Sequence, residues 1–176
     1  MPIYFCAYLK FSIAIHLKTV RCSDGDIIVD EPTFELTTNF LSIEELNAGK
    51  VVLRRYTGLA SYLEIPTYGN ELASPFYGYK IVQIMANAFE GNKTVQTVVL
   101  PESIEILWYH AFAWSSVETV VIKNPNIQIP EGAFSNSNVT TIEFYGTKEQ
   151  WGSHVKLGKD CKVICLDGVI TVDGKE

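Results

Sequence analysis

The sequence lacks the features that would point to several common classes of protein. No apolar run approaches the roughly 18 residues of a membrane-spanning helix, so we expect no transmembrane segment. The chain has 14 basic residues, scattered along its length, against 20 acidic ones. With a net charge of -6, it has no clustered basic face, which argues against a nucleic-acid partner.

Residues of the kind that carry catalysis are also few and dispersed. The three histidines, His16, His110 and His154, fall in separate stretches, and no metalloprotease, phosphate-binding or dinucleotide-binding motif is present. We therefore predict neither an enzyme nor a bound cofactor or metal. Of the four cysteines, Cys161 and Cys165 share one face of a strand-like run, about 13 Å apart and too far for a disulfide. They match zinc spacings poorly, so we interpret them as buried thiols.

Residues 1–17 are apolar enough to suggest a signal peptide. Against that reading, no basic segment precedes them, Lys10 interrupts them, and no Ala-x-Ala site follows. Their alternation instead favours a strand.

A short sequence motif occurs three times in the chain. Its Ala-Phe pairs, Ala88-Phe89, Ala111-Phe112 and Ala133-Phe134, are 23 and 22 residues apart. Each pair precedes a Val-x-x-[Val/Ile]-x-apolar run, and a fixed period of this length is typical of a solenoid whose coils share one core.

The run after each pair is predicted to be a strand of an exposed parallel sheet. Alternation places Val98/Leu100, Val120/Ile122 and Ile142/Phe144 inward. The threonines of the three repeats then fall in register on the outer face. We expect a partner to bind the residues that face outward, which are Thr97, Val99, Thr119, Val121, Lys123, Thr141, Glu143 and Tyr145.

A second internal repeat flanks the first. The pattern Val-x-Cys-x-Asp-Gly-x-Ile-x-Val-Asp runs from Val20 to Asp30 and again from Val163 to Asp173. Asp-Gly between two β-rich runs predicts a two-residue hairpin turn with both central residues at positive φ. We expect hairpins at Asp24-Gly25 and Asp167-Gly168 to cover the two ends of the solenoid. Alternatively, residues 1–30 form the closing end of another module.

Two short helices and several aromatic clusters complete the chain. Ser42 with Glu45, and Thr147 with Gln150, fit capping boxes. We expect Trp151 to close the last coil by packing over its end. We expect the aromatic loop from Tyr68 to Tyr79 to be held by packing against the rest of the domain. Trp108 and Trp114 either pack over neighbouring coils or bind a sugar ring or a protein; both readings stay open.

The stretch from Ile84 to Ser103, with Ala88-Phe89-Glu-Gly and Val95-Gln-Thr-Val-Val-Leu-Pro, resembles BspA-like leucine-rich repeats of bacteria and protists. Tyr145-Gly-Thr-Lys-Glu-Gln-Trp151 is similar to the end module that often follows them. The resemblance implies a right-handed, β-rich leucine-rich-repeat solenoid with short parallel strands, hairpin caps at both ends and one or two short helices. We divide the chain into an N-terminal cap (1–50), the solenoid (51–146) and a C-terminal cap (147–176).

The resemblance also implies a non-catalytic adhesion module at the cell surface or secreted, which binds a host or neighbouring-cell protein or a glycan. Two alternatives stay open. One is a structural unit of a cell or virus surface that associates with copies of itself as a homo-oligomer. The other is an intracellular interaction scaffold.

Overall fold

The short apolar runs of the sequence form strands that belong to three sheets. In a computed structural model, residues 18–22, 25–29, 34–69, 76–152, 155 and 160–171 are described. The predictions for residues 1–17 therefore lie outside the described residues. The strands are β1 (Lys18–Cys22), β2 (Gly25–Val29), β3 (Phe34–Thr37), β4 (Lys50–Tyr56), β5 (Tyr62–Glu64), β6 (Lys80–Ile84), β7 (Thr97–Leu100), β8 (Ile106–Leu107), β9 (Thr119–Ile122), β10 (Thr141–Phe144), β11 (Lys162–Cys165) and β12 (Gly168–Thr171). The helices are α1 (Ile43–Asn47) and α2 (Lys148–Trp151).

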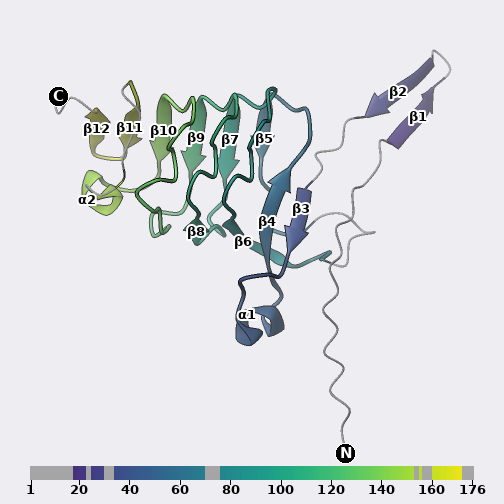
Figure 1. The fold of residues 1–176 in the computed structure, drawn as a ribbon, viewed down its shortest axis with the longest axis horizontal. Coiled ribbons are helices and arrows are strands. Elements are labelled where there is room, and N and C mark those ends of the chain that lie inside the picture. The colour runs from purple at the N-terminus through teal and green to yellow at the C-terminus, as the bar shows by residue number, and fades with distance from the viewer. Residues whose placement is uncertain are drawn as a thin grey trace, which may run out of the picture.

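The repeats build two sheets on opposite sides of a stack. The larger sheet has the order β12-β11-β10-β9-β7-β5, and β5 to β11 run parallel (Figure 1). The smaller sheet has the order β3-β4-β6-β8, with β4, β6 and β8 parallel. The chain alternates between the two sheets from β4 to β9. The result is a strand-rich fold of stacked repeats, in which α1 and α2 are short.

A column of aromatic rings fills the space between the sheets. The rings of Phe89, Phe112 and Phe134 stack face to face, with centroids 5.0 and 5.8 Å apart. Tyr56 continues the column at one end and Trp151 at the other. The alanines that precede the three phenylalanines are fully buried, which lets adjacent coils approach closely. This arrangement confirms the predicted role of the repeated Ala-Phe pair and of Trp151.

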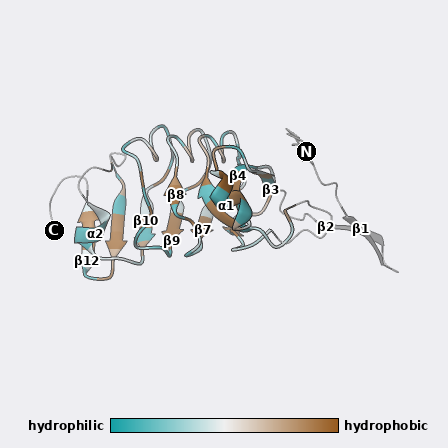
Figure 2. Ribbon diagram, turned by 90° about the horizontal axis from the view of Figure 1, so that it is seen from below, coloured by the Kyte–Doolittle hydropathy of each residue, from teal (hydrophilic) through white to brown (hydrophobic). Residues whose placement is uncertain are grey.

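The predicted inward positions of the strands are confirmed. Val98, Leu100, Val120, Ile122, Ile142 and Phe144 all belong to the core. Figure 2 shows apolar residues along β7 and β9, while many of the connecting turns are hydrophilic.

The two short helices begin where the sequence predicts. Ser42 caps α1 and Thr147 caps α2, each with a complete capping box. Gly49, with φ of 68°, follows α1. No helix among the described residues is long and apolar enough to span a bilayer.

Both predicted hairpins form, but the turn lies one residue earlier than expected. Cys165 pairs with Gly168, so Leu166 and Asp167 make the two-residue loop. The positive φ, 138°, belongs to Gly168, and a Cβ at that position would meet the Lys148 side chain at 2.7 Å. The Lys148 side chain is flexible and could move aside, so the glycine is needed for its φ, and the prediction of positive φ at Asp167 is wrong.

Among the described strands, the N-terminal hairpin does not pair with the repeats as the C-terminal one does. β1 and β2 form a two-stranded sheet of their own, whereas β11 pairs with β10. The core at the N-terminal end is instead covered by β3, whose Phe34 ring packs on Tyr56.

Candidate binding surface

The outward face of the six-stranded sheet carries a row of threonines. Thr97 pairs with Thr119, and Thr119 pairs with Thr141, in direct register. Tyr62 precedes this row on β5 and Lys162 follows it on β11. The three threonines are partly exposed, so the ladder inferred from the 22-residue spacing is present at the surface.

The next outward row is covered in its N-terminal half. Its members, in order across the sheet, are Glu64, Val99, Val121, Glu143, Ile164 and Val169. Val99 is only 3% exposed and Val121 only 9%. The expectation that these two valines lie open to a partner is wrong.

An ion pair explains how this half of the face is closed. Lys123, which follows β9, donates a hydrogen bond to Glu64 Oε1 on β5 at 2.7 Å. Because β7 lies between β5 and β9, the two side chains bridge the outer surface of β7. The hydrogen bond from Lys123 to Glu64 raises the pKa of the lysine, partial desolvation opposes the shift, and Tyr145 and Tyr62 reinforce it. Lys123 is therefore already engaged within the sheet.

The C-terminal half of the same face is open, and beyond Glu143 its side chains are apolar. Ile164 on β11 pairs with Val169 on β12, and both side chains are exposed. Leu166, two residues beyond Ile164, is 74% exposed. Tyr145, which follows β10, is also exposed. We call these four residues the apolar face; of them, the sequence had indicated only Tyr145. The missed signal is the run Val163-Ile-Cys-Leu166, which is apolar at every position where a half-buried strand would alternate.

The predicted tryptophans lie apart from this face. Trp108 follows β8 of the smaller sheet, where its Nε1 donates to Gln83 Oε1 at 3.0 Å. Its ring contacts Phe40, with centroids 5.3 Å apart. Trp108 therefore packs against neighbouring residues, in agreement with the first of its two readings. A groove of about 550 Å³ adjoins it, lined by Ile106, Leu107, Trp108, Tyr109, Ile127, Gln128, Ile129 and Pro130.

Trp114 is placed differently. It is 61% exposed and has a φ of 56°. The corresponding positions of the neighbouring repeats are Gly91 and Asn136, with φ of 73° and 55°. Glycine and asparagine tolerate this left-handed conformation, whereas a large side chain there is strained. An exposed, strained tryptophan is a second place where a ligand could stack.

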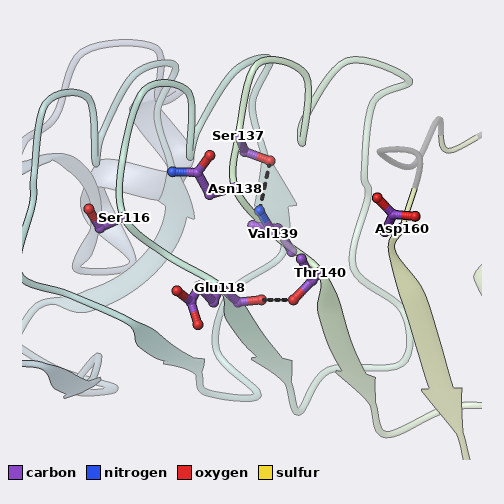
Figure 3. A pocket seen from close by; sticks show the side chains of 7 residues that line it. All are labelled: Ser116, Glu118, Ser137, Asn138, Val139, Thr140 and Asp160. Atoms are coloured by element: carbon purple, nitrogen blue, oxygen red, sulfur yellow. Dashed lines mark hydrogen bonds between the residues drawn. The ribbon is translucent and has the colours of Figure 1, made fainter.

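A polar pocket of about 460 Å³ opens beside the starts of β9 and β10 (Figure 3). Three of its side chains donate hydrogen bonds to backbone carbonyls. Ser137 donates to the Phe134 carbonyl, Asn138 to the Ser115 carbonyl and Thr140 to the Glu118 carbonyl. The pocket also holds the carboxylates of Glu118 and Asp160, which Figure 3 shows on separate sides of it. Among the described residues, no three His, Cys, Asp or Glu side chains gather as metal ligands.

Cys161 and Cys165 are buried free thiols, as predicted. Burial raises the pKa of the Cys161 thiol to about 11, so the reactive thiolate is disfavoured at neutral pH.

Comparison with known proteins points to one class of repeat. The family model described as BspA type leucine rich repeat region matches six copies over residues 68–161. No curated protein matches the chain.

Three bacterial structures resemble the chain. A leucine-rich repeat protein of Bacteroides capillosus is 22% identical, with a TM-score of 0.49 over 79% of this chain and 96% of that one. A T. pallidum leucine-rich repeat protein is 17% identical, with a TM-score of 0.47 over 75% and 61%. A leucine-rich cell surface protein of Faecalibacterium prausnitzii is 19% identical, with a TM-score of 0.41 over 70% of this chain and 28% of that one.

Proposed function

Since the chain belongs to the BspA type leucine-rich repeat family, we propose that it is a non-catalytic binding or adhesion module built on a right-handed solenoid. The family suggests a protein-interaction role, and such repeats typically carry no catalysis. The partner is a protein of a host or neighbouring cell, held against the outward face of the six-stranded sheet. The protein acts at the cell surface or after secretion, where family members are often found.

The observation that carries this proposal is a comparison of the two hairpins. They share Val, Cys and Ile at corresponding positions, but their outer positions differ. Where the C-terminal hairpin has Ile164, Leu166 and Val169, the N-terminal hairpin has Arg21, Ser23 and Asp26. The same backbone register is therefore found with polar residues at these places. Exposed aliphatic side chains at these places are not a requirement of the fold, and clustered exposed apolar residues mark contact surfaces.

The chemistry of the apolar face favours a protein over a glycan. Aliphatic side chains bury well against other apolar side chains, whereas sugar rings stack best on aromatic faces. On this face only Tyr145 offers an aromatic ring. A glycan would find Tyr109 and Trp114 better suited, since both are exposed.

The test replaces the three aliphatic residues by their counterparts, as Ile164→Arg, Leu166→Ser and Val169→Asp. The new Arg and Asp would lie opposite each other in the strand register, as Arg21 and Asp26 do in the N-terminal hairpin. We expect binding to a panel of extracellular-matrix proteins to weaken by at least about tenfold, at an unchanged melting temperature. A matched variant, Trp114→Asn, copies Asn136 and should leave protein binding intact. Loss of glycan-array binding in the Trp114 variant alone would favour a glycan partner instead.

Self-association is the second candidate, because the apolar face adjoins β12, the last strand of its sheet. Light scattering over a concentration series separates the two. A dimer that the triple substitution dissociates into monomers, with no binding to the matrix panel, would favour an assembly unit. A monomer throughout would favour the heterologous partner. An intracellular scaffold is the remaining alternative, and detection of the protein on intact cells by an impermeant biotinylation reagent would contradict it.

A further inference from the structure

The turn between β8 and β9 displays an aromatic ring that the core does not use. Trp114 is 61% exposed, so most of its indole lies outside the packed interior. Its backbone is in the left-handed conformation, at a position where the neighbouring repeats have Gly91 and Asn136. Either of those residues would adopt this conformation with less strain. The stability of the fold therefore does not explain a tryptophan at this place.

Hydrogen bonds fix this residue between the turns of the two adjacent repeats. The Trp114 N–H donates to the Asn136 carbonyl at 2.8 Å, and Lys93 Nζ donates to the Trp114 carbonyl at 2.9 Å. Two residues further on, the Ser116 N–H donates to the Asn92 carbonyl at 2.8 Å. The strained backbone is thus held from both sides, and the ring is attached to a rigid part of the stack. A fixed ring loses little conformational freedom when a ligand binds.

The neighbour on the N-terminal side leaves room beside the ring. Gly91 has no side chain, and a Cβ placed on it would meet no heavy atom within 4 Å. Its repeat is adjacent to that of Trp114, because β7 pairs with β9. Paired strands lie about 4.8 Å apart, so the open space over Gly91 adjoins Trp114. A flat ligand can lie there against the indole.

The surroundings of the ring are polar. The turns on either side, residues 85–96 and 130–140, contain no exposed large apolar side chain. They carry exposed polar residues instead, among them Glu90, Lys93 and Asn136. The Lys93 ammonium has three donors and uses one of them on the Trp114 carbonyl. A protein partner would need further apolar contacts around its aromatic anchor. A sugar ring needs one aromatic face for its C–H groups and polar groups for its hydroxyls.

We propose that Trp114 is the platform of a carbohydrate site, where one pyranose ring stacks on the indole over Gly91. Lys93 and Asn136 provide hydrogen bonds to the hydroxyls of the sugar. The site is separate from the apolar face, which is formed by β11, β12 and the residues that follow β10 and β11. The sugar is therefore a second ligand, in addition to the protein partner. A single stacked ring gives weak binding, with a Kd on the order of millimolar.

The first experiment follows the indole N–H signals of the 176-residue chain by NMR. The probes are methyl β-D-glucopyranoside, methyl β-D-galactopyranoside and N-acetylglucosamine. We expect at least one of them to shift the Trp114 signal with a saturable Kd of about 1–10 mM, and to leave the signals of Trp108 and Trp151 in place. Sorbitol has no ring to stack and should shift none of them. If no pyranose shifts the Trp114 signal, or if sorbitol shifts it equally, the site assignment is wrong.

The second experiment separates a binding role of the ring from a structural one. It measures saturation transfer from the protein to the C–H protons of the sugar. Trp114→Asn, which copies the next repeat, should abolish this transfer and melt at or above the parent, because the strain is relieved. Trp114→Leu keeps an apolar side chain without an aromatic face and should bind at least about tenfold more weakly than Trp114→Tyr. Equal binding by the Leu and Tyr variants, or a Trp114→Asn chain that melts more than about 5 °C below the parent, would overturn the proposal.

The sugar site and the protein site can fail independently. The triple substitution on the apolar face should leave sugar binding unchanged, and Trp114→Asn should leave binding to the matrix proteins unchanged. Binding of matrix proteins without any binding of sugar would refute the carbohydrate site alone. Binding of sugar without any binding of matrix proteins would support this site and refute the protein partner, so that the sugar would be the partner instead.

Discussion

The aromatic column makes a quantitative prediction about Phe112. This ring lies at the centre of the column, fully buried, and stacks on Phe89 with an interplanar angle of 17° and on Phe134 with one of 3°. Replacing a buried phenylalanine by alanine costs about 3–5 kcal/mol, because apolar contacts are lost and a cavity remains. Since each kcal/mol lowers the melting temperature of a protein of this size by about 2–4 °C, Phe112→Ala should melt roughly 6–20 °C below the parent.

A second substitution separates volume from ring stacking. Phe112→Leu keeps most of the volume, for which the expected cost is below about 1.5 kcal/mol. It also removes two ring contacts, each worth about 0.5–1.5 kcal/mol. We therefore expect Phe112→Leu to lose at least about 1 kcal/mol, but less than Phe112→Ala.

The assay is urea unfolding followed by circular dichroism, with Tyr77→Ala as the control. Tyr77 is an exposed aromatic residue and its loss should cost less than about 0.5 kcal/mol. The column would be refuted as a main source of stability if Phe112→Ala cost less than about 1 kcal/mol. Equal costs for Phe112→Leu and the control would refute the contribution of stacking.

Two further predictions concern polar contacts of the predicted site residues. Trp108→Phe removes the donor to Gln83, which is buried, and should cost about 1–3 kcal/mol in urea unfolding, while Tyr109→Phe should be nearly neutral. The raised pKa of Lys123 should be visible by NMR and should return toward its ordinary value in Glu64→Gln. Because this pKa is raised on folding, the pairing favours the folded protein below the ordinary lysine pKa and is lost as pH rises through the folded value; an unchanged pKa in Glu64→Gln would contradict the pairing.

The inward half of the fold could be predicted because its signals are local and repeated. The Ala-Phe pair and the Val-x-x-Val pattern recur at a fixed spacing that is typical of stacked coils. Both patterns predicted core residues, and these residues lie in the core. The capping boxes at Ser42 and Thr147 are also local, since four consecutive residues contain the whole signal.

The outward half was predicted less well because its contacts are distant in sequence. The burial of Val99 depends on Glu64 and Lys123, which are 59 residues apart. No local pattern shows that two charged side chains will meet across an intervening strand. For the same reason, the sequence did not show that Phe34 on β3 would cover Tyr56, or that Trp108 would lie on a different sheet from the threonine row.

The hairpin β11–β12 closes the end of the stack and also carries part of the proposed binding surface. Its inner face carries Val163 and Cys165 against the core, and its outer face carries Ile164 and Val169 toward solvent. The end of a repeat stack has a neighbour on one side only, so it is where such a protein opens first. A partner held on the outer face binds the closed hairpin and not the opened one, and it therefore stabilises the closed end by mass action. Partner binding should consequently slow deuterium exchange in amides 162–171 more than in the central strands. A partner bound at the Trp108 groove should instead leave the difference in exchange rate between these two regions unchanged.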